Sequence, residues 1–333
     1  MKAVNFIVYR LHFHTPLHIG DKRPDDYSNS QGYIHSDTLY AAVLATWARQ
    51  GADIPANGRC GFQVSSLFPF SQNESGETRY FFPRPMADLP FDGDRVSIAK
   101  GLKKIQWLDQ HYFEKVLQRE PIADFGNDLQ DEFCSRSQLG NPIYVRQMSQ
   151  RVAIPRDRNQ DADPRPFYME RLIFAERAGL YFLFEGDEDA RQKLESALDL
   201  LQFEGFGTDR TIGNGLFTWE SGGITLRLPD PAEYAINLSL FCPESRKELT
   251  GMMDANARFD LVKRGGWMTS PGYQSIRKQS VYMFREGGIW RTTRSVAGAP
   301  AIDLRPGSYP VDHPVWRNGS GIFLPIKISG YGI

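Results

Sequence analysis

The segment DEDARQKLESALDLLQFEGFGTDRTIGNGLFTWE, residues 187–220, decides the fold class of this chain. Its first half repeats alanine and leucine at helical spacing, which predicts an amphipathic helix over Asp187–Phe203. A glycine-rich loop, Gly205–Gly215, follows this helix, and Leu216–Glu220 then predicts a strand. P-loops and Rossmann sites run from strand to helix, and no Gly-Lys-Ser/Thr follows the loop, so a nucleotide-binding loop of those kinds is excluded.

Hydrophobic patterns upstream of this segment predict the rest of a first folding unit. Ala3–Phe13 predicts a strand, and Ser36 is a good N-cap for the next helix, which Gly51 ends. Two β-rich runs, Phe167–Ala175 and Leu180–Glu185, predict a hairpin. The resulting order is strand, helix, strand, strand, helix, strand. That order is the ferredoxin-like arrangement, which RNA-recognition modules also use.

An insertion and a second unit complete the predicted architecture. Residues from about 52 to 150 are rich in proline, glycine and serine around one expected helix near Leu102–Gln118, which indicates a long insertion. Gly222, Gly223 and the Leu228–Pro231 stretch predict a boundary. We therefore expect an α+β protein of two ferredoxin-like domains, residues 1–222 with the insertion and residues 232–333. The second unit is expected to hold a helix near Arg246–Asp254 and strands near Val281–Arg285, Ile289–Thr293 and Ile322–Ser329.

Charge and composition limit the classes of function. The net charge of −1 argues against a uniformly basic nucleic-acid binder. Residues 1–204 hold 24 basic and 29 acidic residues (net −5), and residues 205–333 hold 15 and 11 (net +4), so a polyanion site would be local. Three separated cysteines indicate neither a disulfide framework nor a zinc site. The sequence has no signal-peptide core and no apolar run of membrane-spanning length, so a cytoplasmic location away from membranes is expected.

The glycine-rich loop is the first candidate for a nucleic-acid contact. Gly205, Gly207, Gly213 and Gly215 permit positive φ angles and let a phosphate approach bare backbone N–H groups. Arg210, midway along the loop, can add a bidentate phosphate contact. The alternative is a tight connection between helix and strand.

A second candidate is the basic and aromatic stretch Arg258–Arg294. It has eight basic and two acidic residues, a local net charge of +6. Interleaved aromatic rings are typical of sites where cations hold phosphates and rings stack on bases. Within it, the candidate residues are Lys263, Arg264, Gly265, Gly266, Trp267, Arg277 and Lys278. The alternative is a solvated face over core aromatics.

A third basic stretch runs from Arg151 to Arg171 and includes Arg156 and Arg158. Acidic residues nearly cancel its charge, so it is either a solvated loop with internal ion pairs or a hairpin that reaches toward RNA. His12, His14 and His18 could bind a metal, but no fourth ligand is apparent. His18 or His35 could act as a general base in RNA cleavage, yet no catalytic motif supports catalysis.

Several stretches resemble the RAMP superfamily of CRISPR-associated proteins. They are the glycine-rich loop, His14–Gly20 before Ser36-Asp37-Thr38-Leu39, Lys263–Trp267 with Arg277-Lys278 downstream, and His313–Gly319. Within that superfamily, the chain is most similar to the fourth-subunit family of the type III-A Csm effector complex. The resemblance spans nearly the whole chain.

The resemblance implies a non-catalytic role in antiviral defence and no cofactor. Such subunits hold the 5′ repeat handle of the crRNA, dock on the large polymerase-like signalling subunit, and abut the first backbone RAMP subunit. They also insert a β-hairpin thumb that disturbs the pairing of guide and target RNA, and here it would fall in the insertion or in Arg151–Arg171. The expected RNA-binding residues are His18, Ser36, Arg156, Arg158, Gly205, Gly207, Arg210, Gly213, Gly215, Lys263, Arg264, Gly265, Gly266, Trp267, Arg277 and Lys278.

One departure and two alternatives accompany this expectation. Asp209 would repel a phosphate bound next to Arg210. An endoribonuclease of the same superfamily is the main alternative, but the resemblance places the glycine-rich loop of those enzymes in the second domain, whereas here it ends the first. A purely protein-binding subunit would require Arg258–Arg294 to be a core and solvent face.

Overall fold

The computed structural model describes residues 1–20, 27–55, 57–91, 95–122, 128–153, 165–270 and 272–329. Helices and strands mix along the chain, which confirms the α+β class. The helices are α1 (Ser36–Arg49), α2 (Arg95–Lys104), α3 (Gln110–Gln118), α4 (Glu188–Glu204), α5 (Arg246–Met252) and the short 3-10 helix η2 (Arg210–Ile212). The strands of the large sheet are β1 (Lys2–Phe13), β2 (Phe62–Val64), β3 (Phe68–Gln72), β4 (Thr78–Pro83), β5 (Trp107–Asp109), β6 (Leu129–Gln130), β7 (Phe133–Cys134), β10 (Ala178–Gly186) and β11 (Phe217–Leu228).

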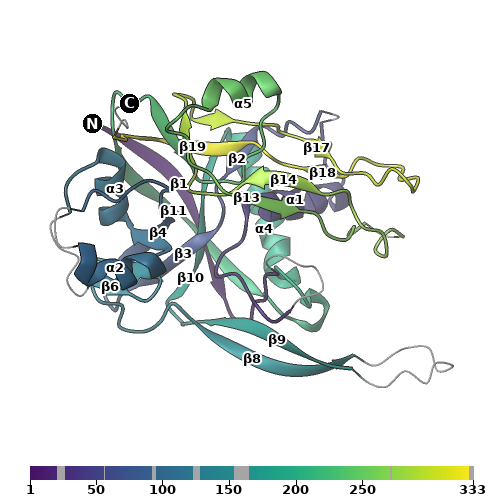
Figure 1. Ribbon diagram of the computed structural model, residues 1–333. Coiled ribbons are helices and arrows are strands. Elements are labelled where there is room, and N and C mark those ends of the chain that lie inside the picture. Colours follow the sequence, from purple (N-terminus) through teal and green to yellow (C-terminus); the bar gives the residue numbers. More distant parts are fainter. Residues whose placement is uncertain are drawn as a thin grey trace.

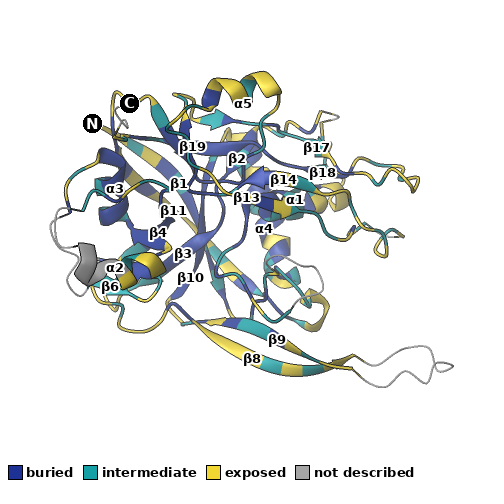
Figure 2. Cartoon of the chain, in the orientation of Figure 1, coloured by how far each residue is buried: buried dark blue, intermediate teal, exposed yellow. Residues whose placement is uncertain are grey.

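Four strands of this sheet have a ferredoxin-like arrangement. Their order is β11-β1-β10-β3, and all three pairings are antiparallel. Helix α1 comes after β1, and α4 comes after β10. The two helices lie side by side, where the indole Nε1 of Trp47 donates to the Lys193 carbonyl at 2.8 Å (Figure 1). Residues 178–184 of β10 are all buried, as expected for a central strand covered on both faces (Figure 2).

The expected hairpin between Phe167–Ala175 and Leu180–Glu185 is wrong, although both runs are strands. The first run belongs to β9 (Arg165–Phe174), which pairs with β8 (Tyr144–Ala153) in a separate two-stranded ribbon. The second run is β10, which pairs with β1, β2 and β3. Local patterning identifies a strand, whereas its partner depends on distant parts of the chain.

The stretch from 52 to 150 contributes directly to the large sheet. Strand β3 pairs with β10, and β4, β5, β7 and β6 extend the sheet outward from it. The single helix expected near Leu102–Gln118 is wrong because residues 107–109 form β5 between α2 and α3. The Asp109 carboxylate caps α3 by accepting a hydrogen bond from the Tyr112 N–H at 3.0 Å, so a second helix begins there.

Two expected boundaries also differ from the structure. Helix α1 has His35 rather than Ser36 at its N-cap, and the Ser36 hydroxyl instead accepts from the Leu240 N–H at 3.0 Å. Strand β11 does not end near Glu220, since it continues through both Gly222 and Gly223 in register with β1 as far as Leu228. Helix α4 is confirmed, with Asp187 as its N-cap.

The C-terminal part contains a smaller sheet packed against the first. Its strands are β12 (Tyr234–Asn237), β13 (Leu261–Arg264), β14 (Val281–Phe284), β15 (Ile289–Arg291), β16 (Val296–Ala297), β17 (Ile302–Asp303), β18 (Trp316–Arg317) and β19 (Gly321–Ile326). Four of them form a sheet in the order β15-β12-β19-β16, while β13 pairs with β14 and β17 with β18. Stacked and edge-on rings of Phe241, Phe284 and Trp290 fill its core.

The ribbon of β8 and β9 projects from the body of the protein (Figure 1). Most of β8 is exposed to solvent (Figure 2). Apolar side chains on the ribbon are exposed as well, namely Val145, Met148, Val152, Tyr168 and Ile173. Such an exposed apolar ribbon marks a surface for a binding partner.

Candidate nucleic-acid interface

The glycine-rich loop is fastened to the segment that follows β1. The N–H groups of Thr208 and Gly215 donate to the carbonyls of His18 and Pro16, at 3.0 and 2.9 Å. Gly207 has a φ of +82°, and a Cβ atom on it would clash with the His18 carbonyl oxygen. These glycines therefore admit the chain's own backbone. Seven N–H groups of the loop are already bonded within the protein, and those of Gly205, Gly213 and Gly215, which were expected to be bare, are among them.

The charged residues of this loop lie at its surface. Arg210 is exposed at the start of η2. Asp209 forms an ion pair with Arg151 of β8 at 3.2 Å. The negative charge that was expected to repel a phosphate is thus offset by the ribbon, so Arg210 is available for an anion beside a locally neutral pair.

Two of the expected RNA-binding side chains, His18 and Ser36, are buried. The His18 Nδ1 lies 2.6 Å from the Glu170 carbonyl oxygen, and the ring is 1% exposed. Ser36 bonds to Leu240 through its hydroxyl, and its N–H donates to the Ser66 hydroxyl at 2.8 Å. Both residues therefore fix the backbone around them.

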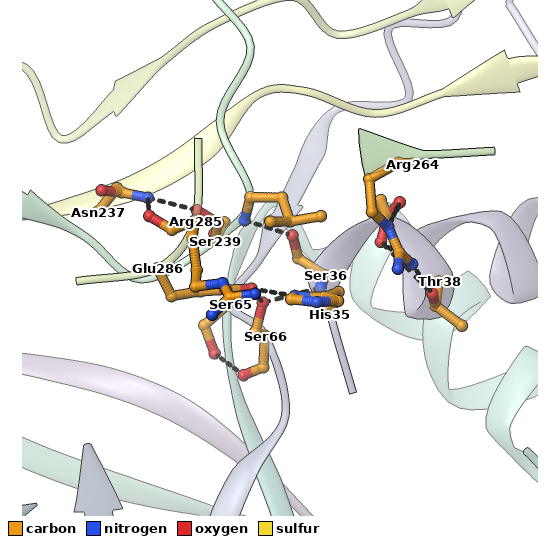
Figure 3. Close-up of polar contacts among 12 residues, drawn as sticks. His35, Ser36, Thr38, Ser65, Ser66, Asn237, Ser239, Arg264, Arg285 and Glu286 are labelled. Atoms are coloured by element: carbon orange, nitrogen blue, oxygen red, sulfur yellow. Dashed lines mark hydrogen bonds and ion pairs between the residues drawn. The ribbon is translucent and has the colours of Figure 1, made fainter. Parts of the chain in front are cut away.

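Arg264 lies in a buried ion-pair cluster centred on Asp37. Its guanidinium donates to both carboxylate oxygens of Asp37 at 3.0 Å and to the Thr38 hydroxyl at 2.9 Å (Figure 3). Arg317 also donates to Asp37, and it reaches the Gly265 carbonyl at 2.9 Å. Burial lowers the pKa of Arg317 to about 10, so it stays charged at neutral pH. The cluster joins the start of α1 to β13 and anchors the Gly-Gly turn.

The rest of the Lys263–Lys278 group surrounds that anchor. Lys263 and Trp267 are exposed, and the guanidinium carbon of Arg277 lies 4.6 Å from the centroid of the Trp267 ring. Lys278 donates its backbone N–H to the Gly266 carbonyl at 2.9 Å, and burial lowers the pKa of its ammonium group. Of the members of this group that the structure describes, Arg264 alone reaches the start of α1, while Arg277 and Trp267 form an exposed pair of a cation and a ring at the surface.

A buried polar network joins the two parts of the protein beside this cluster. The His35 Nδ1 and the Ser66 hydroxyl both bond to Oε1 of Glu286, the first at 2.8 Å (Figure 3). Asn237 donates to the carbonyls of Ser239 and Arg285 at 2.7 and 2.9 Å. Burial lowers the pKa of His35.

A cleft of about 1060 Å³ opens next to this network, between the two parts of the chain. Six cationic residues line it: Arg84, Arg119, Arg146, Arg258, Arg285 and Lys327. Its acidic residues are Asp88, Glu170 and Glu286, which leaves a net charge of +3. Arg146 forms an ion pair with Glu170 at 3.1 Å, whereas Arg119 and Lys327 are exposed and form no ion pair within the described ranges. A wide, mostly cationic cleft of this kind suits a polyanion.

Sequence reasoning found only part of this cleft, because its cations are dispersed over more than 240 positions, from residue 84 to residue 327. Arg258 and Arg285 lie in the predicted basic stretch Arg258–Arg294, whereas the other four cations lie in no motif or charge run. Arg156 and Arg158 lie outside the described residues. His12 and His14 bond to Glu220 and Thr218, and the described part of the chain contains no group of three potential metal ligands.

Helices within the described ranges are all too short or too polar to cross a membrane.

Residues 230–326 match the family model of the CRISPR Csm4 C-terminal domain. Csm4 of the CRISPR system of Thermococcus onnurineus (strain NA1) is 27% identical over 244 residues, which cover 69% of this chain and 73% of that protein.

Solved structures share the fold over nearly the whole chain. A Csm1-Csm4 cassette in complex with pppApA contains a chain with a TM-score of 0.62 and 20% identity, covering 98% of this chain and 100% of that one. A Csm3-Csm4 subcomplex of the type III-A CRISPR-Cas interference complex gives a TM-score of 0.60 at 17% identity, covering 97% and 100%.

Proposed function

We propose that this chain, a Csm4-like RAMP protein, is a non-catalytic RNA-binding subunit of a type III-A CRISPR effector complex. In that role it holds the 5′ repeat handle of the crRNA and caps one end of the complex. The observation that carries the proposal is the cationic cleft between the two parts of the chain. Its exposed rim cations, Arg119 and Lys327, provide ionic contacts for a single strand, and its depth gives bases room to leave the stack.

The proposed protein partners follow from the relatives. Csm4 chains of the same fold were solved together with Csm1 and with Csm3. We assign to this chain the corresponding large signalling subunit and backbone RAMP subunit. The exposed ribbon of β8 and β9 is the proposed thumb, through which the chain would also contact target RNA indirectly.

The expected two-domain division remains part of this proposal, with residues 232–333 as the second unit and the end of the first unit moved from residue 222 to Leu228, where β11 ends. The exposed members of the predicted RNA-binding set, such as Arg210, Lys263 and Arg277, are proposed as direct contacts. The buried members act by holding the backbone that carries them. Arg264 is one of these, since its guanidinium is bonded to Asp37 and Thr38.

The alternative of a guide-processing endoribonuclease finds no support at the candidate histidines. A general base must reach the 2′-hydroxyl of its substrate. His18 and His35 are each only 1% exposed, and the Nδ1 atom of each is within hydrogen-bond distance of a protein oxygen.

The proposal is tested by RNA binding of the purified full-length chain. A double charge reversal, Arg119→Glu with Lys327→Glu, is compared with Lys247→Glu on α5, an exposed cation that does not line the cleft. For a single strand, every phosphate that the protein no longer neutralises reduces the log–log slope of affinity against salt by about 0.7. We expect the double variant to weaken binding of repeat RNA and to flatten its salt dependence, with Lys247→Glu close to wild type.

Equal loss of affinity in both variants, or no loss in either, would show that the cleft is not the RNA site. Incubation of the wild-type chain with labelled repeat RNA tests the nuclease alternative. We expect the RNA to stay intact, and cleavage abolished by His18→Ala would establish the nuclease instead.

A further inference from the structure

Strand β11 lies at one edge of the large sheet, where it pairs with β1. Near its C-terminal end, backbone groups that point away from β1 are bonded to side chains of α3. The Arg227 N–H donates to the Glu114 carboxylate at 3.1 Å, and the Thr225 carbonyl accepts from the Gln110 amide at 2.8 Å. Helix α3 thus covers this end of the free edge.

The same edge is open over the preceding residues. Every second residue of an antiparallel strand points its N–H and C=O to the same side. Trp219, Ser221 and Gly223 therefore present these groups away from β1, and the groups form no hydrogen bond there within the described residues. Ser221 and Gly223 are exposed, and Trp219 is half-buried. We call the segment Trp219–Gly223 the open edge.

The open edge lacks the features that usually keep an edge strand from pairing with another chain. Strand β11 contains no proline, and its register with β1 runs without a bulge along its whole length. Glu220, the one charged residue of the open edge, forms an ion pair with Arg10 at 2.8 Å. Prolines, bulges, free charges and covering segments are the usual means of blocking an edge. An edge without them is suited to a partner strand.

Nothing in the described part of the chain requires glycine at positions 222 and 223. Neither Gly222 nor Gly223 has a positive φ angle. A Cβ atom would make only ordinary contacts, 3.4 Å from the Arg10 guanidinium at the first position and 3.7 Å from the Phe6 carbonyl oxygen at the second. Glycine weakens a strand, and within one it marks a bulge or the close approach of another backbone. Because β11 has no bulge, the two glycines indicate a backbone that approaches from outside the chain.

The chemistry beside the open edge favours a protein segment over RNA. The Asp199 carboxylate of α4 accepts from the indole Nε1 of Trp219 at 3.1 Å, and it forms no ion pair within the described ranges. Since Arg10 offsets Glu220, the charge of Asp199 leaves these surroundings net negative. Outward carbonyls also alternate with N–H groups along the edge, which matches a peptide backbone and repels phosphate. A basic, extended peptide fits both features.

We propose that the open edge of β11 is a docking site for an extended segment of a partner subunit, which joins the large sheet as an additional strand. Such strand addition takes its affinity from backbone hydrogen bonds and its specificity from alternate side chains. The docking segment carries a basic residue beside Asp199. On the same face, it carries a bulky apolar residue where Gly223 leaves room. This inference rests on the proposed function, since it requires the chain to assemble with partner subunits.

The test measures amide hydrogen exchange at single-residue resolution in the full-length chain. The free chain is compared with the complex assembled with the large subunit and the backbone RAMP subunit. We expect the amides of Trp219, Ser221 and Gly223 to exchange at least about fivefold more slowly in the complex, the protection that one hydrogen bond of ordinary net strength provides. The amides of Glu220 and Gly222 face β1 in both states, so they serve as the internal control and should change little.

Two variants separate docking from folding. Ser221→Pro removes an outward N–H that the fold does not use, and proline is tolerated at such edge positions. We expect it to weaken assembly, measured by titration, whereas Ser221→Ala keeps the N–H and should assemble like wild type. Gly223→Val should leave the melting temperature unchanged or raise it, because valine favours a strand. It should weaken assembly by at least about fivefold, because its side chain fills the space of the docking residue.

Exchange that is equally fast at the three outward amides in the free chain and in the assembled complex would overturn the docking site and leave the proposed function in place. Unchanged assembly of both Ser221→Pro and Gly223→Val would do the same. Protection of these amides in the free chain would assign the edge to a second copy, and protection by repeat RNA alone would assign it to RNA; either result excludes the partner strand. Failure of the wild-type chain to assemble with either subunit would contradict the proposed function and this inference together.

Discussion

Replacement of Asp37 by asparagine is expected to destabilise the protein severely. Asp37 is fully buried and is the carboxylate that both Arg264 and Arg317 contact. The side chains of the two arginines are only 15% and 10% exposed, so water offers their charges little compensation. Removal of one partner from a buried ion pair costs about 3–5 kcal/mol, and here a single substitution leaves two cations without their shared anion.

The assay is urea unfolding followed by circular dichroism, with Glu244→Gln as the matched control. Glu244 also pairs with an arginine, Arg59, but the two side chains are 56% and 57% exposed, and such pairs contribute about 0–1 kcal/mol. Arg264→Met should cost less than Asp37→Asn because Arg317 remains paired with the carboxylate. A loss below about 1 kcal/mol for Asp37→Asn would refute the assignment of this cluster as an anchor between the two parts of the chain.

Other substitutions test the network, the loop and the ribbon. Because burial lowers the pKa of His35 amid Glu286, Arg264 and Arg285, its contribution to stability is present above about pH 6.5 and is lost as the pH falls through the lower folded-state pKa, by up to about 1.4 kcal/mol per pH unit. His35→Gln should therefore flatten the unfolding free energy between pH 7.5 and 5.5, and a parallel slope would contradict this. Gly207→Ala should destabilise by more than about 1 kcal/mol and by more than Gly213→Ala, because both have positive φ but only Gly207 faces a backbone oxygen; equal melting temperatures would count against it. Replacement of residues 150–168 by a short turn keeps the buried Met169 and Leu172, so it should leave the chain folded and reduce its assembly with partner subunits, measured by size-exclusion chromatography; unchanged assembly would remove the ribbon from the interface.

The sequence predicts elements with strong local signals. Helix α4 has leucines at helical spacing, which predicts the helix, and the structure confirms it and adds Asp187 as its N-cap. The helix expected over 102–118 fails because Trp107–Asp109 pairs with β4, a partner that local spacing does not reveal. The same limit explains β9, whose apolar alternation identifies a strand but not its pairing with β8.

The candidate site was harder to predict because cationic residues have two roles in this chain. Some form buried ion pairs, and others line the cleft. Arg264 lies in the most basic stretch, which predicted a phosphate contact, yet its partner Asp37 is 227 residues away. Two of the cleft cations show the reverse. Arg119 and Lys327 lie outside any basic stretch of the sequence, and only the fold brings them to the same cleft. A structural cation can therefore be distinguished from a ligand-binding one only when the burial of its side chain and its ion-pair partner are known.

The polar character of the junction between the two parts fixes the shape of the cleft. An apolar junction could slide, whereas hydrogen bonds such as those of Asn237 and Ser239 fix one register. The Ser239 hydroxyl donates to the Val64 carbonyl at 2.8 Å and accepts from the Ile322 N–H at 3.0 Å, which links strands β2 and β19. A cleft that is held rigidly in this way keeps its cations at fixed separations, which favours a ligand whose charges match that spacing.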